Sequence, residues 1–178
     1  VAVCAAPTAA LVAPVARVAR ASARSAYDMG GPPGYYTGPE RTPILDTVVE
    51  PRDMNGLSMA EVKQLAHELR WDTIRAVSKT GGHLGSSLGV VELTVALHKV
   101  FDAPEDRILW DVSHQCYPHK LLTGRHGMLG KLRQRDGMAG FPEPNESPFD
   151  LFSVGHAGTA ISTAVGMARG DELTGEHA

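Results

Sequence analysis

Two short apolar runs, each followed by a polar loop and a helix-forming stretch, constrain the fold of this chain most strongly. Residues 107–111 are Arg-Ile-Leu-Trp-Asp and residues 151–154 are Leu-Phe-Ser-Val, lengths that are typical of buried strands. Helices are expected at 114–122 and from 159 to about 168. Strand, loop and helix in repeated order indicate an α/β fold, an incomplete parallel sheet with flanking helices. Ligand sites are expected at the carboxyl ends of its strands.

Two further helices are expected before the first strand. Ser58 and Glu61 form an S-x-x-E capping box, which satisfies backbone donors at a helix start. Apolar residues follow at helical spacing and predict a helix from about 59 to 79, which ends at the glycines 81–82. A second apolar stretch, to about residue 100, places four side chains on one face: Leu88, Val91, Val95 and His98.

The amino-terminal residues differ in composition from the rest. Residues 1–30 are rich in Ala, Val, Arg and Ser and nearly lack acidic residues, which is typical of an organelle transit peptide, with a disordered leader as the alternative. Residues 31–57 begin with a dense run of Gly and Pro, which predicts a linker or extended arm. The folded domain is expected at 58–178, and a transit peptide would place the protein in a chloroplast or other plastid.

Charge and cysteine content disfavour several classes of protein. A formal net charge of −3 provides no positive field for nucleic acid or an anionic membrane, and no apolar run approaches the length of a membrane span. The cysteines, Cys4 and Cys116, are far apart, which argues against a disulfide framework or a zinc-thiolate cluster. We expect neither nucleic acid nor a membrane as a partner.

Three loops carry the residues with the most useful chemistry: 81–85 with His83, 111–115 with His114, and 155–158 with His156. Each places a histidine beside glycine or serine at a helix start, where free backbone N–H groups favour an anion such as a phosphate. Imidazole can bind a phosphate oxygen or transfer a proton near neutral pH. A turn or capping role is the alternative for each loop alone, but three such loops along one sheet edge favour a shared site.

The other histidines fit structural roles better. His114 and His119 could both face a metal, but no third ligand follows at the spacing of a zinc site. His67 and His98 lie within predicted helices and are expected at the surface or the edge of the core. We therefore expect no metal ligand among these residues.

Residues 81–125 and 137–170 resemble the thiamine-diphosphate domain of the 1-deoxy-D-xylulose-5-phosphate synthase family. The most specific part is 111–125, DVSHQCYPHKLLTGR, whereas segments like GGHLGSSLG at 81–89 occur across the transketolase group. The resemblance implies the first part of a thiamine-diphosphate-binding fold. It also implies an enzyme that condenses pyruvate with glyceraldehyde 3-phosphate, with loss of carbon dioxide, to 1-deoxy-D-xylulose 5-phosphate, a precursor of isoprenoids and thiamine.

The same resemblance implies roles for particular residues. It assigns proton transfer to His83 and cofactor binding to four others: His114, Gly155, His156 and Ala157. Two positions depart from the family pattern, since Ser113 stands where the family usually has Gly and Ala157 where it usually has Ser. The alternatives are a truncated non-catalytic paralogue or binding partner, and a transketolase-like enzyme with other substrates.

The family's Mg²⁺ ligands include a Gly-Asp-Gly motif, which this sequence lacks up to Ala178. We expect that motif to follow Ala178, and we expect the printed chain to be inactive alone because a diphosphate without its metal loses most of its charge compensation. The complete enzyme is expected to be a homodimer.

Overall fold

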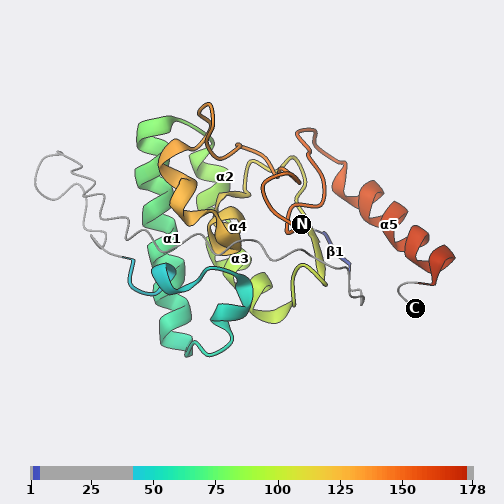
Figure 1. Ribbon diagram of the computed structural model, residues 1–178, viewed down its shortest axis with the longest axis horizontal. Helices are drawn as coiled ribbons and strands as arrows, with labels where there is room; N and C mark the ends of the chain where they lie inside the picture. The colour runs from blue at the N-terminus through green and yellow to red at the C-terminus, as the bar shows by residue number, and fades with distance from the viewer. Residues whose placement is uncertain (1, 5–41, 176–178) are drawn as a thin grey trace, which may run out of the picture.

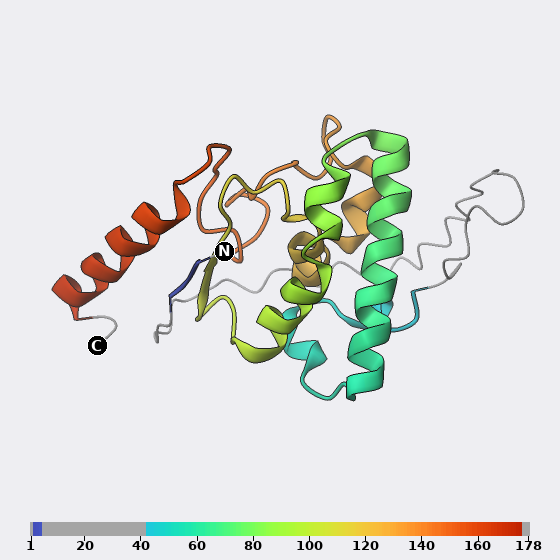
Figure 2. The ribbon, with the colours of Figure 1, turned by 180° about the vertical axis from the view of Figure 1, so that it is seen from behind.

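The computed structural model describes residues 2–4 and 42–175 and is rich in helix. In chain order the elements are β1 (Ala2–Cys4), η1 (Leu45–Thr47), η2 (Pro51–Met54), α1 (Met59–Thr80), α2 (Leu84–Leu88), α3 (Val91–Val100), β2 (Arg107–Leu109), α4 (Tyr117–Lys120), η3 (Leu121–Arg125), η4 (His126–Lys131) and α5 (Ala160–Thr174). The helices α1 to α4 form one body, and α5 projects from it on the side of the two strands (Figures 1 and 2).

Helix α1 confirms the first predicted helix. The Ser58 hydroxyl accepts a hydrogen bond from the Glu61 amide, and the Glu61 carboxylate accepts one from the Ser58 amide, 2.7 Å away. The helix ends at Gly81, which has a φ of 77°, a backbone conformation that favours glycine. Helix α1 therefore begins and ends where its local sequence predicts.

The second predicted helix is present as α2 and α3, separated at Gly89 and Val90. Val91, Val95 and His98 are buried on the inner face of α3, and α3 packs along α1 (Figure 2). After β2, α4 begins at Tyr117, with Pro118 in its first turn, and the chain turns sharply at Gly124, where φ is 91°.

Residues 42–57, expected as the end of a linker or extended arm, instead pack into the body. Leu45, Val48 and Met54 are buried, and the amides of Ile44 and Leu45 donate to the buried Glu68 carboxylate of α1. Apolar side chains at these positions draw the segment onto α1. Residues 5–41, which hold most of the predicted leader and linker, lie outside the described residues.

The predicted parallel sheet is not observed within residues 2–4 and 42–175. The sheet found there has two antiparallel strands, β1 and β2, in which Val3 pairs with Ile108. Residues 151–154 form no strand, and none of the described backbone hydrogen bonds joins them to β2. The two segments instead line one small pocket, together with residues that include Trp110 and Phe149. The two segments thus share a pocket but lack the backbone hydrogen bonds of a ladder, which needs strands about 4.8 Å apart.

One apolar core joins the helical body. It includes residues of 42–57, α1, α3, β2, α4 and the turn after it. Helix α5 contributes little to this core, since Ile161, Val165 and Leu173 are exposed. No helix within the described ranges is long and apolar enough to cross a membrane.

Candidate active site

His83 and His114 form a stacked pair. His83 is the residue before α2 and His114 follows β2, and their ring centroids are 3.6 Å apart with an interplanar angle of 28°. The hydroxyls of Ser86 and Ser87 donate to the carbonyl of His114 at 3.2 and 3.1 Å. The structure thus brings together the histidines of the first two predicted loops.

The surroundings of the His114 imidazole disfavour its charged form. Desolvation lowers its pKa below the usual range, and the nearby His83 and Arg133 lower it further. Its Nδ1 atom is buried and has no hydrogen-bond partner among the described residues. A buried polar atom without a partner is costly, so His114 Nδ1 is available for a hydrogen bond with a ligand.

Phe141 connects the third loop to this pair. Its ring centroid lies 5.2 Å from that of His114, and a Cβ added at Gly155 would lie 3.8 Å from its Cζ atom. His156 and Ala157 follow in the same loop and are exposed. All three predicted loops therefore meet around His114 and Phe141.

Asp111 occupies the amino terminus of α5. Its carboxylate accepts hydrogen bonds from the amides of Gly158, Thr159 and Ala160 at 3.1, 3.0 and 3.4 Å. These amides were expected to be free for a phosphate. In the structure they donate hydrogen bonds to the Asp111 side chain instead.

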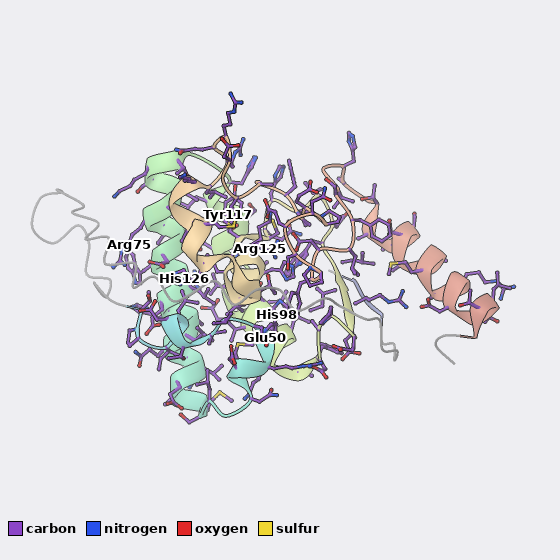
Figure 3. All side chains as sticks on the ribbon, viewed as in Figure 1. Glu50, Arg75, His98, Tyr117, Arg125 and His126 are labelled. Atoms are coloured by element: carbon purple, nitrogen blue, oxygen red, sulfur yellow. The ribbon has the colours of Figure 1, made fainter. Side chains whose placement is uncertain are left out.

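A buried polar network lies beside the site. His119 lies between His98 and Asp150, with nitrogen–nitrogen and nitrogen–oxygen distances of 2.9 Å, and Arg125 contacts the same carboxylate through both terminal nitrogens. Figure 3 shows Arg125 and His98 near the middle of the helical body. His98 is 2% exposed, so its expected place at the surface or core edge is wrong. Its neighbours in α3, Val91 and Val95, share the buried face.

Two residues that sequence reasoning did not select complete the surroundings. Tyr117 lies beneath the first loop, where its hydroxyl accepts a weak hydrogen bond from the His83 amide at 3.4 Å. Arg133 has a φ of 60°, and its side chain lies within 3.0 Å of a Cβ added at Gly140. Neither residue adjoins a glycine in the sequence, so no local pattern pointed to them. No group of His, Cys, Asp or Glu side chains suited to a metal is found among the residues that the structure describes.

Comparison with known proteins adds an independent observation. The profile of the 1-deoxy-D-xylulose-5-phosphate synthase family matches residues 45–178. The chain is 62% identical over 143 residues to a probable chloroplastic 1-deoxy-D-xylulose-5-phosphate synthase of Capsicum annuum, covering 80% of this chain and 20% of that protein. It is 57% identical over 135 residues to the synthase of Rhodobacter capsulatus, covering 76% of this chain and 21% of that protein. The chain therefore spans about a fifth of the length of these curated relatives.

Proposed function

Because the chain belongs to the 1-deoxy-D-xylulose-5-phosphate synthase family, we propose that it forms one wall of a thiamine-diphosphate site in an enzyme of that activity. The reaction is the condensation of pyruvate with glyceraldehyde 3-phosphate, with loss of carbon dioxide, to 1-deoxy-D-xylulose 5-phosphate. When bound, the cofactor supplies an electron sink for decarboxylation, and the protein supplies binding, orientation and proton control.

The meeting of His83, His114 and the Gly155 loop carries this proposal. The unpartnered Nδ1 of His114 and the lowered pKa of its ring fit a hydrogen bond to a polar cofactor. Gly155 has no side chain to block the space beside Phe141. We assign cofactor binding to His114, Gly155, His156 and Ala157.

His83 is the proposed proton-transfer residue. Its side chain is exposed at the edge of the site and stacks on His114, so it can reach a bound substrate while its orientation is held. At the start of α2, its amide donates a weak hydrogen bond to the Tyr117 hydroxyl. An imidazole so placed can act as a general acid or base toward a bound substrate.

Several finer proposals follow from the family. We propose that residues 107–110 and 151–154, which line one pocket, are neighbouring parallel strands in the full-length protein. Mg²⁺ would be held by residues outside those described here, and the complete enzyme would be a homodimer. A plastid location is supported by the chloroplastic relatives from Capsicum annuum and rice, while the Rhodobacter capsulatus relative shows that the family also occurs in bacteria.

The test uses protein expressed from the complete coding sequence. With pyruvate, glyceraldehyde 3-phosphate, thiamine diphosphate and Mg²⁺, we expect deoxyxylulose phosphate, measured by chromatography and mass spectrometry. His83→Asn should lower kcat by about 10²- to 10⁴-fold, the range for loss of a general acid–base group. His67→Gln, on the exposed face of α1, should leave kcat unchanged.

Other outcomes separate the alternatives. A folded protein that binds the cofactor but makes a different ketose phosphate would indicate a transketolase-like enzyme with other substrates. A folded protein without cofactor binding would indicate a non-catalytic paralogue. Either result would refute the proposed activity.

A further inference from the structure

The loop proposed to bind the cofactor is joined to the His114 loop by one carboxylate. Asp111 Oδ2 accepts from the Gly158 amide, and Oδ1 accepts from the amides of Thr159 and Ala160. Asp111 stands three residues before His114, while Gly158 follows directly after the 155–157 loop. These contacts therefore span two of the three loops that form the site.

The electrostatics of this contact favour an ionised carboxylate. The hydrogen bond from the Gly158 amide, with further ones from neighbouring amides, holds the pKa of Asp111 below its usual range. A negative charge at the amino terminus of α5 also interacts favourably with the helix dipole. Asp111 thus accepts at both oxygens at neutral pH.

Segment 151–160 is held by hydrogen bonds at its two ends, whereas between them its contacts are apolar, with the pocket beside Trp110 and with Phe141. Before it, the buried Asp150 is fixed by His119 and Arg125. After it, Asp111 fixes residues 158–160. From Phe152 to Ala157 most residues are exposed, and none of the described hydrogen bonds from this stretch reaches another element. The polar contacts that position the loop therefore lie at its two ends.

Asp111 and His114 are held in a fixed relation by a tight turn. Val112 and Ser113 have φ values of 57° and 82°, and the Ser113 hydroxyl donates to the Trp110 carbonyl at 2.9 Å. The side-chain amide of Gln115 donates a hydrogen bond to the backbone carbonyl of Asp111 at 2.8 Å. A displacement of the Asp111 contact would therefore move the 155–157 loop relative to His114.

We propose that Asp111 is a positioning residue whose carboxylate fixes the Gly155–Ala157 loop relative to His114 and thereby sets the affinity for thiamine diphosphate. The proposal rests on the proposed cofactor site. Asp111 itself contacts backbone amides of this chain and acts through the loop that precedes them.

The experiment measures thiamine-diphosphate affinity and thermal stability separately, in protein from the complete coding sequence. Isothermal titration calorimetry with Mg²⁺ present gives the Kd for wild type, Asp111→Asn and Asp111→Ala, at a temperature where each is folded. Glu61→Gln is the matched control, because Glu61 is also a capping carboxylate but lies at the start of α1, away from the site.

We expect Asp111→Ala to raise the Kd by about tenfold or more, the loss expected for charge-assisted hydrogen bonds. Asp111→Asn keeps one acceptor oxygen and a similar volume, so its Kd should lie between those of wild type and Asp111→Ala. Glu61→Gln should lower the melting temperature without changing the Kd. If Asp111→Ala is insoluble, Asp111→Asn carries the test.

An unchanged Kd in the Asp111 variants, with only a lower melting temperature, would overturn the inference and leave Asp111 as a helix cap. If wild type itself does not bind thiamine diphosphate, the proposed function fails instead. The two failures are therefore distinguishable.

Discussion

His98 and His119 show how single side chains in the core are fixed by their hydrogen bonds. A carboxylate only accepts, so His119 donates to Asp150 through Nε2 and, in its neutral form, accepts from His98 Nε2–H through Nδ1. This leaves His98 Nδ1 buried without a partner among the described atoms. Burial, with the nearby His119 and Arg125, lowers the pKa of His98 to about 2.

The first prediction concerns the pH dependence that follows. Unfolded His98 titrates near its ordinary pKa of about 6.5, whereas folded His98 stays neutral, so the unfolded state binds more protons below that pH. The free energy of unfolding should therefore fall as the pH drops from about 6.5 towards 4.5. His98→Gln, which keeps a donor for His119, should reduce this slope by up to about 1.4 kcal/mol per pH unit.

Urea unfolding followed by circular dichroism at a series of pH values measures that slope. His67→Gln is the control, since His67 is exposed on α1 and its loss should leave the slope unchanged. Equal slopes for wild type and His98→Gln would contradict the assigned neutral state of the buried imidazole.

Ser113 shows how a departure from the family pattern fits the backbone. Its φ of 82° lies in the left-handed region, which favours the Gly that the family usually has. The buried hydroxyl donates to the Trp110 carbonyl, which offsets part of the conformational cost. Ala157, the other departure, is exposed. Its methyl side chain makes no hydrogen bond, and nothing in the structure explains this substitution.

Among the elements, α5 depends most on specific polar contacts. Most of its residues are exposed, its first turn is capped by Asp111, and its last turns are joined to β2 by an ion pair between Arg107 and Asp171, both largely buried. It also contacts β1. Figure 1 shows that α5 otherwise projects from the helical body.

The second prediction tests the Arg107 contact. Arg107→Gln removes the ion pair that joins Asp171 to β2, so the carboxyl-terminal turns of α5 should open more often. Hydrogen exchange followed by mass spectrometry should show faster exchange at about residues 168–174 and unchanged exchange in α1. Arg169→Gln is the matched control, because its ion pair with Glu172 within α5 is exposed and contributes little. Equal exchange in the two variants would show that Arg107 does not hold α5.

At the scale of the whole molecule, residues 42–57 belong to the folded unit. Leu45 is fully buried and its amide donates to Glu68 of α1 at 2.8 Å. The His126 ring, at the start of η4, pairs with Asp72 of α1 at 2.6 Å. Segments far apart in the sequence are thus packed against one face of α1, and the family match also begins at residue 45.

The third prediction follows from that packing. Leu45→Ala should lower the free energy of unfolding by about 2–5 kcal/mol, since it leaves a cavity in a closed core. Val49→Ala, in the same segment but 50% exposed, should change it by less than about 0.5 kcal/mol. Chemical denaturation of the printed chain measures both. Similar small effects would show that residues 42–57 are an extended arm, as the sequence predicts.

The sequence alone determined the features that depend on neighbours along the chain. The capping box at Ser58, the end of α1 at Gly81 and the apolar face of α3 follow from local hydrogen bonds and periodicity. The three histidine loops were also found this way, since glycine and histidine beside a helix start are visible without a structure.

Only the tertiary structure decided what depends on contacts between distant residues. Asp111 lies 47 residues before Gly158 yet accepts a hydrogen bond from its amide. His98 is buried against His119, which in turn contacts Asp150. Residues 151–154 have the composition of a strand, but strand pairing depends on the position of a neighbour, and here they line a pocket with β2 without backbone hydrogen bonds to it. The pattern of apolar residues determines which face of a helix or strand is buried, whereas tertiary packing determines which other element that face contacts.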